Sequence, residues 1–130
     1  MFQIVALMIL SQQPVPPVAE GIASYYTVAS SGRVTASGEA LRDEELTCAL
    51  RNGVFGDYYL VVAENGKSVI CRLNDRGPYV KGRVIDLSEA AMRKLAVNTG
   101  LIKVHVYHIG ADPPLEPASP RLRQYAQLGP

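Results

Sequence analysis

The segment Val69–Leu95, VICRLNDRGPYVKGRVIDLSEAAMRKL, carries most of the information about the fold. It begins with an apolar, β-prone run, breaks at a Gly-Pro pair, and continues as a second short strand over 83–86. Ser88 is a good N-cap, and the residues after it begin with an acid and end with two basic side chains, which favours a helix over 89–95. The segment therefore predicts strand, turn, strand and one short helix.

The segments on either side add further strands. Tyr58–Ala63 and Lys67–Leu73 are β-prone runs separated by Glu64-Asn65-Gly66, and an Asn-Gly pair in that position is a strong hairpin signal. Two further runs, over 23–27 and 102–109, have the same character. Many short strands with one helix in about 90 residues indicate a mainly β fold, a small closed barrel.

Length and composition limit the classes of function. The chain has 130 residues and 14.1 kDa, room for a single domain, which we place at 20–110. A net charge of +1, with no basic run longer than two residues, argues against nucleic acid as a partner. No apolar stretch approaches the roughly 20 residues of a membrane span. We expect a monomer.

The two ends differ from the domain in composition. The apolar run Ile4–Leu10 and the Pro-rich spacer after it, within 1–19, suggest a signal peptide and export to the periplasm or cell envelope. A buried strand, or a start site within a longer leader, are the alternatives. The segment 111–130 contains five prolines and is expected to be an extended or mobile tail outside the domain.

The two cysteines, Cys48 and Cys71, are an even number in a chain with a possible export signal. Because oxidising compartments preserve such bonds, a disulfide between them is the favoured interpretation. The alternative is a pair of buried thiols.

Three segments taken in order resemble the rare-lipoprotein-A family of double-psi β-barrels. They are Gly21–Tyr26, then Gly32–Glu39 with its Thr-Ala-Ser-Gly-Glu ending, and the long segment that ends at Leu95. The Asn-Asp-Arg-Gly-Pro and Val-Ile-Asp-Leu-Ser motifs within the last segment are the most specific part of the match. The resemblance implies a six-stranded double-psi β-barrel with one or two short helices. It also implies lytic cleavage of peptidoglycan glycan strands, as in septal ring lytic transglycosylases.

The family's acidic residues fall on Glu39 and Asp75, which the resemblance marks as catalytic. The family also carries a histidine eleven residues after the glutamate, and this chain has Leu50 at that position. The chain therefore lacks a hydrogen-bonding, titratable group that its relatives carry. This departure keeps a second interpretation open, a non-catalytic barrel that binds peptidoglycan or another glycan.

The chemistry of a lytic transglycosylase can be carried by one carboxyl group. The muramyl C6 hydroxyl attacks its own anomeric carbon, so a single acid can protonate the leaving oxygen and then accept the C6 proton. Asp75, at a strand end beside a turn, is our candidate for this role. Glu39 would orient sugar hydroxyls or keep Asp75 protonated. The alternatives are that Asp75 is a turn aspartate bonded to nearby backbone, and that Glu39 is a solvated loop acid.

Other residues near the motif receive supporting roles. Candidates for contact with acetamido sugars are Arg76, Tyr79 and Tyr26. Structural roles are expected for Asp86, which would bond loop backbone, and for Gly77 and Pro78 in the turn. His105 and His108 are three apart on a strand and so point to opposite faces. We therefore expect neither a metal site nor a cofactor.

Overall fold

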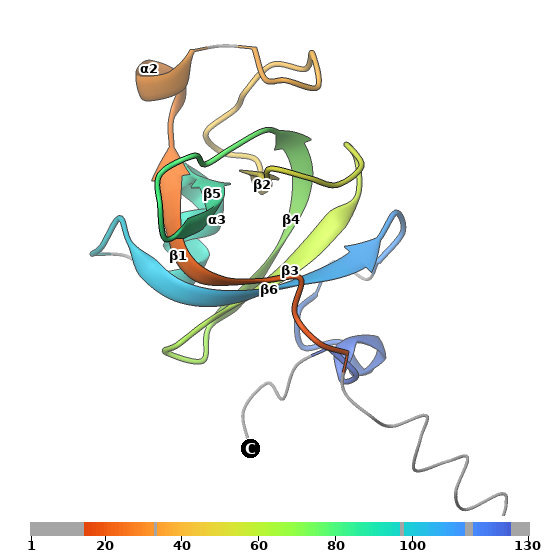
Figure 1. Ribbon diagram of the computed structural model, residues 1–130. Helices are drawn as coiled ribbons and strands as arrows, with labels where there is room; N and C mark the ends of the chain where they lie inside the picture. The colour runs from red at the N-terminus through yellow and green to blue at the C-terminus, as the bar shows by residue number, and fades with distance from the viewer. Residues whose placement is uncertain (1–14, 33, 97, 114–115, 126–130) are drawn as a thin grey trace, which may run out of the picture.

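The computed structural model describes residues 15–32, 34–96, 98–113 and 116–125. Six strands close into a barrel in the order β1-β5-β2-β4-β3-β6 (Figure 1). The strands are β1 (Ala19–Tyr26), β2 (Thr47–Ala49), β3 (Tyr58–Ala63), β4 (Ser68–Asp75), β5 (Arg83–Ser88) and β6 (Ile102–Gly110). The helices are α2 (Val28–Ser31), α3 (Glu89–Leu95) and the 3-10 turn η1 (Pro120–Leu122). The apolar run Ile4–Leu10, interpreted as part of a signal peptide, lies outside the described residues.

The pairing of the strands is that of a double-psi barrel. β1 runs parallel to β5, and β2 runs parallel to β4, while the remaining neighbours are antiparallel. Parallel neighbours cannot be joined by a tight turn, and neither parallel pair is consecutive in sequence. The connection between β1 and β2 and the connection between β4 and β5 pass over the same end of the barrel (Figure 1). The fold expected from the resemblance is confirmed.

The inner faces of all six strands form one core. Fully buried side chains from different strands include Ala23, Cys48, Val61, Leu73, Ile85, Leu87 and Val104. Ser88 is the N-cap of helix α3, and its side chain accepts a hydrogen bond from Ala91 N, as the sequence predicted. It buries Ala91, Met92 and Leu95 against the same core and is seen through the ring of strands in Figure 1.

The outer face of β3 and β4 is covered by the C-terminal segment, contrary to expectation. Leu122 in η1 is only 2% exposed and packs with Leu60 and Ile70, and Tyr125 packs against the same cluster. One proline precedes this turn and another begins it. Proline does not prevent the turn, because its first position tolerates a residue without a backbone N–H. The prediction of an extended segment is therefore wrong for residues 116–125, which form part of the folded domain.

Cys48 and Cys71 are free, buried thiols, so the favoured disulfide is not formed. Cys48 on β2 is paired with Leu73 on β4, which leaves Cys71 two residues away along the neighbouring strand. Burial raises the pKa of the Cys48 thiol, and the adjacent Cys71 adds to the effect.

Candidate active site

A shift in strand register turns Asp75 out of the barrel. Cys48 on β2 pairs with Leu73 on β4, but the next residue, Ala49, pairs with Asp75, so Asn74 is an extra residue in β4. Cys48 and Leu73 belong to the core, whereas Ala49 belongs to a separate cluster outside it. An inserted residue re-aims the side chain that follows it. Asp75 therefore shares the outer face of the barrel with Ala49.

Two aspartates lie in one row across this outer face. Ala49 is paired with Asp75 of β4 on one side and with Asp86 of β5 on the other. Ser24 of β1 continues the row, and its hydroxyl donates a hydrogen bond to Asp86 Oδ1. Because neighbouring strands lie about 4.8 Å apart, the backbones of the two aspartates are roughly 10 Å apart. We call this row of four residues the carboxylate face.

The turn formed by residues 34–40 is bonded directly to Asp75. Ala36 N donates a hydrogen bond of 2.9 Å to Asp75 Oδ1, and Arg76 N donates a second bond of 2.9 Å to the same oxygen. One carboxylate oxygen of Asp75 therefore holds the turn that carries Glu39. The structure thus brings together the two acids that the sequence placed 36 positions apart (75 − 39).

Glu39 is held in place by a cation. Its Oε1 accepts a hydrogen bond of 2.7 Å from Arg72 Nη1, and Arg72 Nη2 lies 3.6 Å from Glu45 Oε2. Burial alone would raise the pKa of Glu39, but hydrogen bonds from Asn74 and Arg72 and the charge of Arg72 outweigh it and lower that pKa. Glu39 is therefore ionised, whereas Asp75 has only backbone donors on Oδ1. The sequence gave no sign that Arg72 joins this site.

Arg76 anchors the loop that follows β2. Its Nη2 donates 2.7 Å to Gly53 O and its Nη1 donates 3.4 Å to Leu50 O. The guanidinium carbon also lies 4.1 Å from the centroid of the Phe55 ring, a cation–π contact. The expected contact of Arg76 with sugar remains a proposal, and any such contact would use a side chain that is already fixed.

The three remaining turn residues lie beside the carboxylate face. Tyr79 is 76% exposed, whereas Gly77 and Pro78 are buried. A Cβ built on Gly77 would lie 3.9 Å from Asp86 Oδ2 and 3.7 Å from the Tyr79 ring, so the turn passes close to the second aspartate. Of the aromatic candidates, Tyr79 has a free ring face for a sugar.

Tyr26 does not have such a face. It is 8% exposed and packs with Leu41 and Ala49, and its hydroxyl donates 3.4 Å to Asn74 Oδ1. Burial raises the pKa of Tyr26, which therefore stays a neutral donor. Tyr26 therefore supports Asn74 and exposes little ring surface, and its contact with sugar stays a proposal.

Leu50, at the position of the family histidine, belongs to the core. It is 6% exposed, and its backbone N donates 3.3 Å to Asp75 O. The backbone therefore lies next to Asp75 while the side chain packs away from the carboxylate face. Among the described residues, no group of three His, Cys, Asp or Glu side chains could hold a metal ion. None of the helices in the described part of the chain is long and apolar enough to cross a bilayer.

Comparison with known proteins gives the family. The family model described as lytic transglycolase matches residues 18–106, which contain every strand except the end of β6. An endolytic peptidoglycan transglycosylase RlpA from Pasteurella multocida (strain Pm70) is 45% identical over 94 residues, 72% of this chain and 31% of that protein. A probable endolytic peptidoglycan transglycosylase RlpA from Treponema pallidum (strain Nichols) is 46% identical over 98 residues, 74% of this chain and 30% of that protein.

A solved structure supports the fold. The apo expansin of Clavibacter michiganensis superposes with a TM-score of 0.55 at 21% identity, covering 69% of this chain and 49% of the expansin. The chain spans only about a third of the length of the curated relatives it matches. The matched segment nevertheless includes the barrel, the turn with Glu39 and the end of β4 with Asp75. The chain therefore belongs to the lytic transglycolase family and is an RlpA-like double-psi β-barrel.

Proposed function

We propose that this domain is an endolytic peptidoglycan lytic transglycosylase. It cleaves glycan strands between N-acetylmuramic acid and N-acetylglucosamine and leaves a 1,6-anhydro-muramyl end. The observation that carries the proposal is the junction of two carboxyl groups at the end of β4. Asp75 Oδ1 is bonded to Ala36 N in the turn that bears Glu39, and Glu39 is paired with Arg72.

In the proposed reaction, Asp75 acts first as an acid and then as a base. Its carboxyl proton passes to the glycosidic oxygen as the bond from that oxygen to the muramyl anomeric carbon breaks. The C6 hydroxyl of the same muramyl residue attacks that carbon, and its proton returns to Asp75. No water is consumed. Such a cycle needs one carboxyl group that changes its protonation state.

The different partners of the two acids support this division of roles. Glu39 is fixed as an anion by Arg72, which suits it to orient sugar hydroxyls and to stabilise positive charge at the anomeric carbon. Asp75 faces outward on the carboxylate face, and the exposed Tyr79 in the turn that follows β4 is suited to stack on a pyranose ring. Asp86, bonded to Ser24, would keep the structural role expected from the sequence.

The proposed substrate also sets the location and partners. Relatives named as peptidoglycan transglycosylases support a place in the cell envelope, and we propose the periplasm and a monomeric domain. The competing candidate is a barrel that binds glycan without cleaving it. Leu50 favours that candidate, because no imidazole is present where relatives carry one.

Incubation with peptide-free glycan strands, followed by mass spectrometry of the products, tests the proposal. Wild type should release anhydro-muramyl ends. Asp75→Asn keeps the shape and the acceptor oxygen but cannot deliver a proton, so turnover should fall by about 10²-fold or more. Glycan affinity should change little. If wild type binds strands and releases no anhydro product, the binding candidate replaces the enzyme.

The matched control is Asp86→Asn, an identical change on the neighbouring part of the same row. Its effect on turnover should follow any loss of folded protein, measured by thermal melting. Should Asp86→Asn abolish turnover in a fully folded protein while Asp75→Asn cleaves normally, the acid has been assigned to the wrong aspartate.

A further inference from the structure

A pocket opens at the end of the barrel where β4 terminates. Its volume is about 480 Å³, within the range of roughly 300–1,000 Å³ found for small-ligand sites. Apolar side chains from the starts of β1 and β5 and from the loop after β2 form most of its wall. We call it the mouth pocket, and the residues that matter below are Ala19, Leu50, Val84, Arg51, Asp57 and His108.

One wall of the mouth pocket carries a paired histidine. His108 Nε2 lies 2.7 Å from Asp57 Oδ2, and the ring packs at 5.2 Å, centroid to centroid, from Tyr59. The His108 side chain is 45% exposed and the Asp57 side chain 18%. A neutral imidazole that donates Nε2–H to a carboxylate presents Nδ1 as a hydrogen-bond acceptor. In the neutral form of His108 with the proton on Nε2, the pair leaves Nδ1 as an acceptor on an exposed ring.

The rim of the mouth pocket is fixed before any ligand arrives. Arg51 donates from Nε to Pro78 O and from Nη2 to Arg83 O, each at 2.7 Å. Arg76 holds Gly53 O from the other side at 2.7 Å. A site with a preformed rim loses less free energy on binding, because fewer groups must be ordered.

The lining of the mouth pocket carries one positive side chain, Arg51, and one negative side chain, Asp57, so neither sign of charge is in excess. The guanidinium of Arg51 already donates to two carbonyl oxygens, and the carboxylate of Asp57 is paired with His108. The lining therefore does not require a net charge on the ligand, and a neutral group avoids the free-energy cost of removing an ion from water. A neutral group with one N–H donor and a small apolar part satisfies the acceptor nitrogen and the apolar wall together.

Leu50 joins the mouth pocket to the strand end that carries the proposed acid. The Leu50 side chain lines the pocket, while its backbone N donates to Asp75 O at 3.3 Å. The backbone of the pocket wall is thus hydrogen-bonded to the backbone of Asp75.

From these observations we infer that the mouth pocket binds the acetamido group of a glycan residue. The acetyl methyl packs against Ala19, Leu50 and Val84, and the amide N–H is donated to Nδ1 of His108. This inference rests on the proposed function for the class of substrate, and it gives the barrel a site for the N-acetyl group separate from Asp75.

Binding of two defined tetrasaccharides to the wild-type chain tests the inference. One is the tetramer of N-acetylglucosamine, and the other is cellotetraose, which has hydroxyl groups in place of the acetamido groups. In ¹⁵N-detected titrations, the acetylated tetramer should shift the amides of Asn52, Gly53 and Val84, and cellotetraose should leave them unchanged. Equal shifts with both sugars, or none with either, overturn the inference. A trialanine peptide that shifts these amides in place of the sugar also overturns it.

His108→Phe removes the acceptor nitrogen and keeps the ring. It should weaken binding of the acetylated tetramer by about three- to tenfold, the effect of losing one hydrogen bond, with no change for cellotetraose. The matched control is His105→Phe on the same strand, since His105 is 46% exposed and lies beside Glu20 rather than the pocket. Thermal melting checks that both variants fold. If His108→Phe does not fold, the wild-type titration still decides.

The failure of this inference is distinguishable from failure of the proposed function. Acetyl-dependent shifts at the pocket without any anhydro-muramyl product would support the acetamido site and contradict the proposed transglycosylase activity. The opposite result is a folded His108→Phe variant that cleaves normally and binds the acetylated tetramer as wild type does. It would contradict the acetamido site and support the proposed transglycosylase activity.

Discussion

The packing of the C-terminal segment predicts a large effect from one substitution far from the proposed chemistry. Leu122 is 2% exposed and contacts Leu60 and Ile70 on the outer face of the barrel. Leu122→Ala removes buried methyl groups and leaves a void beneath η1. Such substitutions cost about 2–5 kcal/mol. Because η1 is a single turn at the edge of the domain and can settle into the space, we expect about 2–3 kcal/mol.

Urea denaturation and thermal melting measure this loss. For a domain of this size, 1 kcal/mol lowers the melting temperature by about 4 °C, so the expected shift is roughly 8–12 °C. The control is Leu101→Ala, the same chemical change at a leucine that is 48% exposed. It should change the free energy of unfolding by less than about 0.5 kcal/mol.

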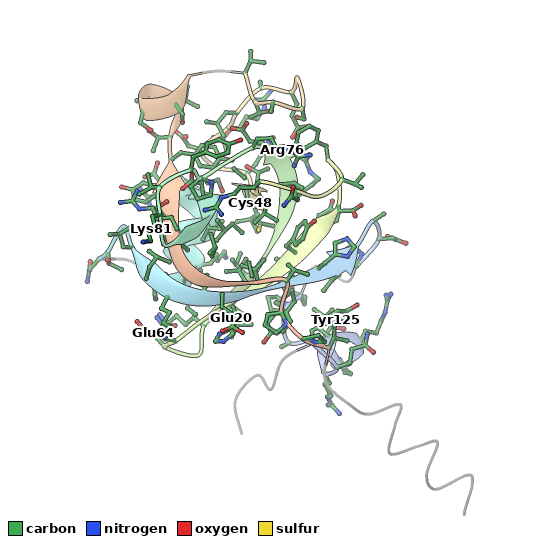
Figure 2. The ribbon with its side chains drawn as sticks, viewed as in Figure 1. Glu20, Cys48, Glu64, Arg76, Lys81 and Tyr125 are labelled. Carbon is green, nitrogen blue, oxygen red and sulfur yellow. The ribbon has the colours of Figure 1, made fainter. Side chains whose placement is uncertain are left out.

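A second readout separates stability from activity. Tyr125, in the same segment as Leu122, lies on the opposite side of the barrel from Arg76, as Figure 2 shows. Leu122→Ala should therefore leave glycan cleavage unchanged at temperatures where the variant is folded. If Leu122→Ala and Leu101→Ala have equal stability, the C-terminal segment does not pack on the barrel and the description of η1 as part of the domain is refuted.

Three further predictions concern the loops and the core. Because the pKa of Glu39 is lowered, its pairing with Arg72 stabilises the protein above about pH 4.3, the pKa of glutamate in the unfolded chain. This contribution is lost as pH falls through the pKa of Glu39 in the folded protein. Arg72→Met should therefore make stability less dependent on pH on the acid side, and an unchanged dependence would contradict the pairing. Gly53→Ala should destabilise the protein more than Gly56→Ala in urea titrations. Both glycines have positive φ, but only a Cβ on Gly53 would clash, at 2.4 Å from the Tyr59 hydroxyl oxygen. Equal losses in the free energy of unfolding would show that the loop after β2 lies elsewhere. Cys48 and Cys71 should resist a thiol reagent in the native protein and both react after unfolding without reductant; two thiols that stay unreactive in denaturant would indicate a disulfide.

Regular local patterns made much of the fold predictable. The strand at Tyr58–Ala63 and the helix at Glu89–Leu95 have the predicted bounds, because each is set by residues next to one another in sequence. β2 escaped prediction from residue pattern because Thr47–Ala49 is three residues long and buried at every position. It is a strand through its pairing with β4 and β5, which only the closed barrel supplies.

The orientation of the site side chains was less predictable. The family motif located Asp75 in the sequence, but its outward direction depends on the register shift at Asn74, which arises from pairing with β2. Adjacent residues in a strand point to opposite faces, and in β1 Tyr25 is 44% exposed whereas Tyr26 is 8% exposed. The pattern gave the alternation but not which residue was buried.

The apolar run of β3 held a signal for the covered outer face. Tyr59 and Val61 face the core, while Leu60 packs under Leu122 and Val62 lies against the same outer cluster. A strand that faces water on one side alternates between apolar and polar residues, and this strand does not. The lack of alternation was a reason to expect a cover, but proline content decided the interpretation of the tail.

The division of β4, β2 and β5 into an inner and an outer face has a consequence for how such a domain can change over time. Residues such as Leu73, Cys48 and Leu87 determine whether the chain folds, and residues one or two positions away in sequence determine what the outer face presents to a ligand. Substitutions at Asp75 or Asp86 therefore leave the inner layer intact. A barrel built this way can gain, alter or lose a chemical activity without first losing its stability.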